Sequence, residues 1–233
     1  MMQRAAATWE RYLRGRYSLY RYRYTAAVWQ KVLFAFGMAC LTGLAAQIRI
    51  PLPWTPVPIT GQTFAVLLSG VLLGKWWGGI SQVFYVGIGA AGVPWFSGWS
   101  GGVGCLTGPT GGYLIGFILA ALFLGFFTDS FINSRRFLPM LGLMLFANFV
   151  LIHGPGLIWL NTFPYELWLK DVPILGLGPY SGRGLLPLLM VGTIPFIPGD
   201  ITKAVVAALI TKGIAPKEAY NGELDKGRIW RIP

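Results

Sequence analysis

The sequence has no Asp, Glu, Lys or Arg between Trp76 and Thr128, and it has only one histidine and two cysteines in 233 residues. An uncharged stretch of this length is far longer than a soluble core segment needs, so a soluble globular domain is excluded. No His, Cys or carboxylate residues have metal-ligand spacing, and no glycine-rich run is followed by the lysine of a phosphate-binding loop. A metal site and a nucleotide site are therefore not expected. Cys40 and Cys105 give little support for a disulfide.

Apolar residues dominate the chain, which is 55% hydrophobic with a mean hydropathy of +0.58. A helical crossing takes about 20 residues, so the length suits one membrane domain, 32–212. We expect an all-α integral membrane protein, a bundle of six transmembrane helices at 32–48, 61–75, 78–92, 111–128, 137–158 and 186–211. The outer loops would be 49–60, 93–110 and 159–185.

The net charge of +11 is concentrated at the two ends of the chain. Residues 1–31 hold seven basic residues against Glu10, and residues 212–233 hold five against three acids. Basic residues flank the cytoplasmic ends of spans, so this pattern predicts a cytoplasmic N-terminal segment, 1–31, and a cytoplasmic tail, 213–233. The expected location is the plasma membrane, or the inner membrane in a cell that has two, with multiple crossings.

Arginine alternates with tyrosine in the N-terminal stretch RYLRGRYSLYRYRY, residues 11–24. Such interleaving occurs in nucleic-acid contacts, but beside a membrane span it is better explained by anionic lipid headgroups. We therefore predict anionic lipids, and no nucleic acid, as partners of this segment.

One acid and one base, Asp200 and Lys203, stand in the sequence PFIPGDITK at 195–203. The two prolines interrupt a helix, which predicts a half-helix beginning at about Gly199 with its free amides directed into the membrane. Residues three apart share a face of that half-helix, and broken helices of this kind bind substrate carboxylates in transporters. The alternative is an internal ion pair that only neutralises itself.

Glycine and aromatic residues are combined in the segment 92–117, which includes Trp95, Phe96 and Trp99. Glycine lets a backbone approach a ligand closely, and aromatic faces can cover it, so the segment suggests a lid or pocket wall. The alternative is a tight outer loop whose tryptophans belong to the interfacial aromatic belt.

A serine-protease motif, G-x-S-x-G, occurs at 98–102 around Ser100, and the only histidine is His153. An intramembrane serine protease is thus an alternative from a different class. The motif arises easily by chance in a glycine-rich segment, and the chain has no second histidine for an oxyanion site. We do not expect an enzyme.

Small residues recur at intervals of four in the first expected span, at Ala35, Ala39 and Gly43. Such a stripe lets another helix approach closely, and that helix can belong to this chain or to a partner.

Four segments together resemble the BioY family, the biotin-binding S component of energy-coupling-factor (ECF) transporters. These are PVPITGQTFAVLLSGVLLG (56–74), GAAGVPWF (89–96), LTGPTGGYLIGF (106–117) and IPFIPGDITK (194–203). The resemblance covers about residues 32–212. It implies six helices, a biotin site near the outer face, no cofactor and no ATP hydrolysis by this chain.

The resemblance also implies site residues. Asp200 and Lys203 match the charged pair that helps the family bind biotin, and Gln62, Thr110 and Tyr113 match positions that shape or line the pocket. Trp95 and Trp159 would sandwich the bicyclic ring. Some family members have an arginine in the glycine-rich outer loop, whereas this loop has Ser100 and no basic residue.

Partners follow from the same resemblance. Ala35, Ala39 and Gly43 look like the surface that docks on the transmembrane coupling subunit, and ATPase subunits would drive transport. The alternatives are an S component for another small vitamin and a membrane scaffold without a ligand.

Overall fold

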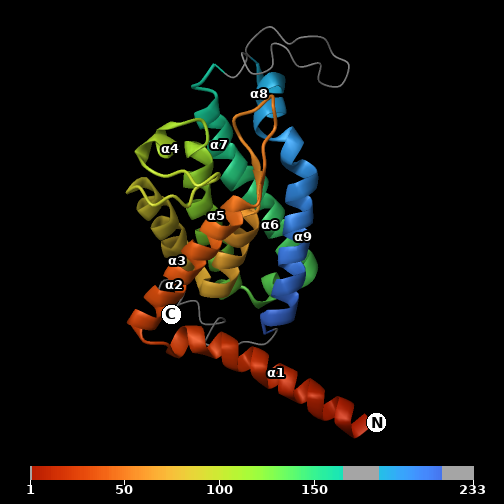
Figure 1. Ribbon diagram of the computed structural model, residues 1–233. Helices are drawn as coiled ribbons and strands as arrows, with labels where there is room; N and C mark the ends of the chain where they lie inside the picture. The colour runs from red at the N-terminus through yellow and green to blue at the C-terminus, as the bar shows by residue number, and fades with distance from the viewer. Residues whose placement is uncertain (1, 165–183, 217–233) are drawn as a thin grey trace.

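The computed structural model describes residues 2–164 and 184–216, and it is a helical bundle with one long helix across its base (Figure 1). The helices along the bundle are α2 (Val28–Gln47), α3 (Gln62–Ala90), α5 (Gly111–Ser130), α6 (Phe137–Phe146), α7 (His153–Leu160), α8 (Leu185–Gly192) and α9 (Ile197–Ile214). The basal helix is α1 (Met2–Thr25). Within the described residues, five helices or continuous helical segments are long and apolar enough to cross a membrane, so the chain is a multi-pass membrane protein.

The helix α3 reverses its direction at Gly74, whose φ of 83° is non-helical. A straight helix would separate Gln62 from Tyr85 by about 35 Å at 1.5 Å per residue. Instead the Gln62 side chain donates to the Tyr85 hydroxyl over 2.5 Å, and Gln82 donates to Ser69 over 3.1 Å. The two limbs therefore pack antiparallel, and they correspond to the predicted segments 61–75 and 78–92.

The segment that carries the predicted charged pair is a broken helix, as its prolines indicate. α8 ends at Gly192, a short 3₁₀ turn η4 (Ile194–Phe196) follows, and α9 begins at Ile197, two residues earlier than predicted. The irregular backbone at Thr193 (φ −141°, ψ −52°) lies between the two helices. This break places Asp200 in the first turn of α9.

The predicted span 137–158 is continuous but not uniform. α6 follows a 3₁₀ turn η1 (Ile132–Arg135), and a π-helical stretch η2 (Ala147–Ile152) joins α6 to α7. A π-bulge shifts the register of the side chains that follow it, and such bulges are frequent at functional sites. Asn148 lies within η2, and His153 follows it directly.

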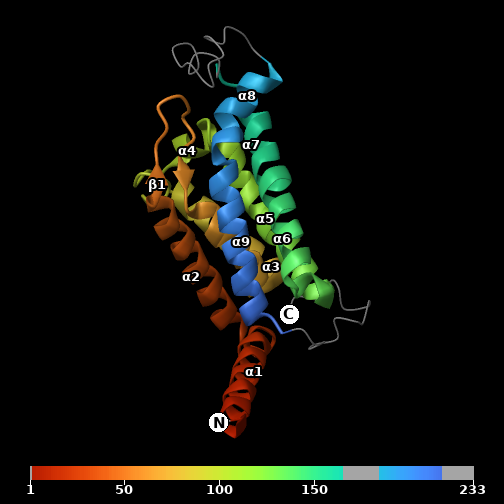
Figure 2. The same ribbon diagram turned by 90° about the vertical axis from the view of Figure 1, so that its right-hand side faces the viewer.

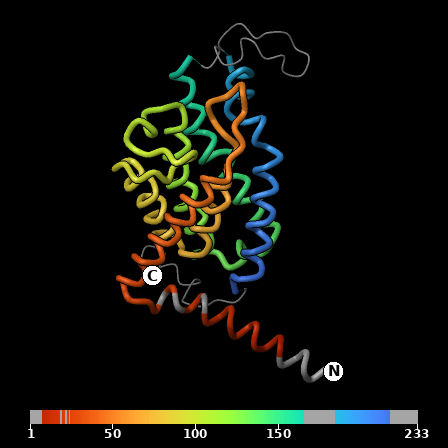
Figure 3. Tube along the Cα trace, viewed as in Figure 1, coloured from red at the N-terminus to blue at the C-terminus, as the bar shows by residue number. Residues whose placement is uncertain are grey.

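The end of the bundle opposite α1 is built from two irregular segments. One is a narrow hairpin with strands β1 (Arg49–Ile50) and β2 (Ile59–Thr60), which runs between α2 and α3 (Figure 3). The other is the predicted glycine-rich loop, 93–110, which contains the short helix α4 (Val103–Thr107). Trp99 in this loop has a positive φ of 58°, a conformation rare for any residue other than glycine. The hairpin extends toward α8 and α9, whereas the glycine-rich loop lies on the side of α3, α5 and α7 (Figure 1).

The small-residue stripe of α2 packs inside the chain, so the predicted docking surface there is wrong. Ala35 and Ala39 are both 0% exposed, and Gly43 faces Trp95 so closely that an added Cβ would lie 3.0 Å from the Trp95 Cβ. The stripe serves the close approach of α2 to α3. The exposed face of α2 carries larger apolar residues, among them Leu33 and Leu44.

Two predicted segments fall largely outside the described residues. The predicted outer loop 159–185 is described only at its ends, and the predicted tail 213–233 only as far as residue 216.

Candidate ligand-binding site

A cavity of about 290 Å³ lies at the end of the bundle opposite α1. Its walls come from the β1–β2 hairpin, the glycine-rich loop and the adjoining ends of α3, α5, α7 and α9. This volume is at the lower end of the range for small-molecule sites. The lining mixes aromatic and aliphatic side chains with a small number of polar and charged groups. That combination is typical of a site that orients one small amphipathic ligand.

Asp200 is the centre of a buried polar network, with only 3% of its surface exposed. Its Oδ2 accepts from the Asn148 side-chain amide and from His153 Nε2, each over 2.9 Å. Its Oδ1 pairs with Lys203 Nζ at 2.5 Å and accepts a longer hydrogen bond of 3.5 Å from Thr63. Four donors thus converge on one carboxylate, which offsets the cost of its burial.

His153 links Asp200 to the backbone break between α8 and α9. A carboxylate only accepts, so His153 Nε2 donates to Asp200, while Nδ1 lies 3.1 Å from the Thr193 hydroxyl. Because Nδ1 also contacts the Gly192 carbonyl, the ring joins Asp200 to the break between α8 and α9. The histidine therefore positions the carboxylate.

Lys203 lies on the same face of α9 as Asp200, as their spacing predicts. Its ammonium group pairs with Asp200 and donates to the Thr60 carbonyl over 2.9 Å. An ammonium group has three hydrogens, so these two contacts leave one for a ligand. Lys203 also lines the cavity. It therefore belongs both to an internal ion pair and to the wall of the cavity, so these two predicted alternatives do not exclude each other.

Three further predicted residues line the same cavity: Gln62, Thr110 and Tyr113. Gln62 begins α3, and its amide oxygen accepts from the Thr60 hydroxyl over 2.8 Å. Thr110 immediately precedes α5. The Tyr113 hydroxyl donates to the Gly192 carbonyl over 2.8 Å, so it connects α5 to the end of α8.

The two predicted sandwich residues lie behind the wall of the cavity. Trp95 donates from its indole to the Tyr85 carbonyl over 2.9 Å and packs against the Tyr85 ring. Trp159 donates to the Gly108 carbonyl over 2.9 Å. Neither is a lining residue, so the structure does not bring them together around the cavity. Both instead brace the glycine-rich loop, since indole N–H groups inside a protein require an acceptor.

Sequence reasoning missed Arg49, which lines the cavity from strand β1. Its guanidinium lies against Gly98 so closely that any side chain at that position would overlap it. Arg49 thus stands beside the glycine-rich loop, which has no basic residue of its own. In the antiparallel pairing of β1 with β2, Arg49 lies opposite Thr60, and the Thr60 carbonyl accepts a hydrogen bond from Lys203. The fold, not sequence proximity, brings the two cations to one cavity.

The structure does not bring Ser100 and His153 together, as a serine protease would require. The Ser100 hydroxyl donates to the Ser97 carbonyl over 2.9 Å, while the His153 ring nitrogens contact Asp200, Gly192 and Thr193. A nucleophile needs its base within hydrogen-bond reach. Among the described residues, no group of three or more His, Cys, Asp or Glu side chains could hold a metal ion.

Comparison with known proteins gives concordant relatives. A probable biotin transporter BioY of Methanothermobacter thermautotrophicus is 52% identical over 172 residues, which cover 71% of this chain and 100% of the relative. The biotin transporter BioY of Thermotoga maritima is 36% identical over 167 residues, 72% of this chain and 85% of the relative.

A solved structure has the same fold. The crystal structure of the S-component for biotin from an ECF-type ABC transporter superposes with a TM-score of 0.65 at 25% identity, over 78% of this chain and 89% of that one. The model of the BioY family matches residues 19–219, which is most of the sequence. The chain therefore belongs to the BioY family.

Proposed function

We propose that this chain binds biotin in the cavity and acts as the S component of an ECF-type vitamin importer. The observation that carries this proposal is that five side chains singled out in the sequence, Asp200, Lys203, Gln62, Thr110 and Tyr113, line one cavity. The relatives are named as biotin transporters, and the solved structure with the same fold is an S-component for biotin, so they point to the same ligand. A transport subunit of this family is not an enzyme, and the chain needs no cofactor for capture.

The two ends of biotin suit the two ends of the cavity. The valerate carboxylate needs cationic donors, and Arg49 offers five N–H groups at the exposed rim. The ureido ring has a carbonyl oxygen and two N–H groups. The remaining Lys203 hydrogen suits that oxygen, and Asp200 Oδ1 suits an N–H group, because its contact with Thr63 is long at 3.5 Å.

The middle of the ligand is apolar, and the cavity offers apolar side chains to contact it. Phe117, Leu114, Ile152 and Phe196 are among its lining residues. Burial of apolar ligand surface there contributes about 25 cal/mol for each Å² removed from water. These side chains replace the predicted tryptophan sandwich.

We also propose six crossings with both termini in the cytoplasm of a cell with a single plasma membrane, or on the inner side of an inner membrane. Counting the limbs of α3 separately adds one crossing to the five apolar segments. In this proposal the Gly74 turn, which joins the two limbs, lies near the membrane surface. Its neighbours Arg23 and Asp129 are charged, as that depth requires.

The proposed partners are a transmembrane coupling subunit and ATPase subunits. Their docking surface lies elsewhere than Ala35 and Ala39, which are buried inside this chain. A large side chain at either position would disrupt the packing of α2 on α3, so such a variant would not test docking. Anionic lipids are proposed as partners of α1, because this helix exposes several arginines.

Calorimetry of the detergent-purified chain with biotin tests the proposal, with Lys203→Ala as the site variant. The matched control is Lys212→Ala, an exposed lysine in the last turn of α9. We expect one-to-one binding that is lost in Lys203→Ala and kept in Lys212→Ala. A folded wild-type chain that gives no heat with biotin would contradict the proposal, and a panel of other small vitamins would then test the alternative S component.

A further inference from the structure

The basal helix α1 lies outside the part of the chain that the family explains. The family match begins at residue 19, so most of α1 precedes it. The helix is not among the segments that could cross a membrane. It runs across the end of the bundle opposite the cavity and extends well beyond it on one side (Figures 1 and 2).

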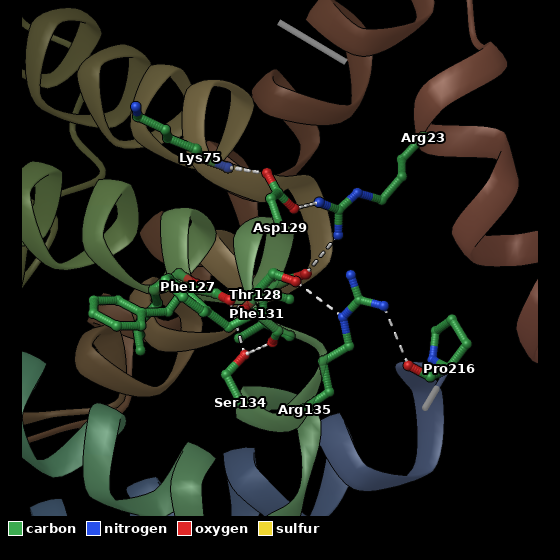
Figure 4. A network of polar contacts seen from close by, with 11 residues as sticks. Arg23, Lys75, Phe127, Thr128, Asp129, Phe131, Ser134, Arg135 and Pro216 are labelled. Carbon is green, nitrogen blue, oxygen red and sulfur yellow. Dashed lines mark hydrogen bonds and ion pairs between the residues drawn. The ribbon is translucent and has the colours of Figure 1, made fainter. Parts of the chain in front are cut away.

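Contacts at three places fix how α1 lies on the bundle. Near its C-terminal end, Arg23 pairs with Asp129 and donates to the Val71 carbonyl over 3.0 Å (Figure 4). Asp129 also accepts from the Lys75 amide at the turn of α3. Further along, Arg16 donates to the Ala215 carbonyl, and the Tyr12 hydroxyl donates to the Gly213 carbonyl over 2.6 Å. One face of α1 is therefore turned to the bundle.

The face that meets the bundle stays apolar where α1 leaves it. At 100° per residue, Trp9 and Leu13 fall on the same side of the helix as the bundle-facing Tyr20. Tyr20 is buried, whereas Trp9 and Leu13 are 59% and 42% exposed. Because the spans of the bundle lie in the membrane, the side of α1 that faces the bundle also faces the membrane. Trp9 and Leu13 are thus directed toward lipid.

The opposite face of α1 is basic. Arg11, Arg14, Ser18 and Arg21 are all exposed there, and Arg14 pairs with Glu10 at 3.5 Å. Glu10 is the only acid of α1, against six arginines. A helix is about 10 Å across, close to the Debye length at physiological salt, so these arginines still lie in the potential of an anionic surface.

From this arrangement we infer that α1 is an interfacial helix that binds an anionic bilayer surface. Trp9 and Leu13 insert at the headgroup boundary, and the arginines attract the anionic lipids. The inference rests on the membrane placement of the bundle and is independent of biotin, so it can fail while biotin binding stands. It also explains why a strongly charged helix is tied to the base of the bundle at three places.

Spin-label accessibility on the full chain tests the placement. In a background with Cys40 and Cys105 replaced, a nitroxide is attached at Leu13→Cys or at Ser18→Cys, which lie on opposite faces of α1. The protein is reconstituted in phosphatidylcholine bilayers with or without phosphatidylglycerol. We expect the label at 13 to be relaxed mainly by oxygen, which partitions into lipid, and the label at 18 by an aqueous nickel chelate. This contrast should grow with phosphatidylglycerol.

Charge variants test the anionic preference. Replacing Arg11, Arg14 and Arg21 with glutamine should shift the equilibrium between attached and detached α1 by roughly a hundredfold, because each basic residue near an anionic surface contributes about fivefold. Replacing the same three with lysine keeps the charge and should change little. The inference is overturned if both labels contact the nickel chelate equally, if phosphatidylglycerol has no effect, or if label 13 is protected only when coupling subunits are added.

Discussion

At the scale of single residues, the two cations of the cavity differ in what surrounds them. Lys203 already has an acid partner in Asp200, and that acid is held by Asn148 and His153. Arg49 has no acid within ion-pair distance among the described residues. A positive charge beside a small-molecule cavity and without an internal partner favours an anionic ligand group. In the proposed function, the buried pair and Arg49 contact different ends of the ligand.

Replacing Arg49 with alanine should weaken biotin binding by about 10- to 100-fold, because a hydrogen bond between charged groups contributes about 1.5–3 kcal/mol. Biotin methyl ester has no carboxylate charge, so its affinity should change far less in the same variant. Calorimetry with both ligands on wild type and Arg49→Ala separates the two effects. An equal loss for acid and ester would show that Arg49 acts through the shape of the hairpin rather than through the carboxylate.

The pair Asp200 and Lys203 could be predicted from sequence, whereas Arg49 could not. Spacing of three on a helix brings two side chains to one face whatever the rest of the fold does. Arg49 reaches the cavity only because the β1–β2 hairpin folds against Gly98, which lies in a separate loop. His153 was visible as the single histidine, but its contact with Asp200 depends on the π-helical stretch before it.

At the scale of elements, apolar length predicted where the long apolar helices lie, but not how neighbouring helices pack. The break before α9 follows from its prolines, and the two limbs of α3 match the two apolar segments predicted at 61–75 and 78–92. The small residues Ala35 and Ala39 allow close approach of a helix from this chain or from a partner protein. The sequence alone therefore could not show that α3, and not a partner, packs there. Long-range packing decides that choice.

The reversal of α3 makes a specific prediction at Gly74. Its backbone (φ 83°, ψ −178°) is nearly exclusive to glycine, and an added Cβ would meet Arg23 and Asp129. Gly74→Ala should lower the free energy of unfolding by about 1–3 kcal/mol, which lowers the Tm by roughly 2–10 °C. Thermal unfolding in detergent measures this.

The matched control is Gly142→Ala in α6, where nothing lies within 4 Å of the new methyl group. Alanine favours a helix over glycine by about 1 kcal/mol, so this variant should be neutral or slightly stabilised. If Gly74→Ala and Gly142→Ala had the same Tm, a side chain at position 74 would not strain the turn.

At the scale of the whole molecule, α9 connects the cavity end of the bundle to its base. Its first turn holds Asp200 at the cavity, and its other end is bound by Tyr12 and Arg16 of α1. The charged groups at the base form a second network around Asp129 and Arg135 (Figure 4). Arg135 is 0% exposed and donates to the carbonyls of Thr128 and Pro216, so Pro216, just after α9, is also held there. Among the described residues, the cavity end has few charges, and the base has many.

This asymmetry predicts the orientation and the number of crossings, which impermeant maleimide labelling of cells can measure. Single cysteines are introduced at Pro53 in the hairpin, Trp99 in the glycine-rich loop and Asn133 in η1, all exposed, in a background without Cys40 and Cys105. Basic residues stay on the cytoplasmic side, so positions 53 and 99 should be labelled in intact cells, and position 133 only after permeabilisation. If α3 crossed the membrane once, positions 53 and 99 would lie on opposite sides and only one of them would be labelled. Labelling of position 133 in intact cells would instead show that the bundle has the opposite orientation, with α1 on the outer surface.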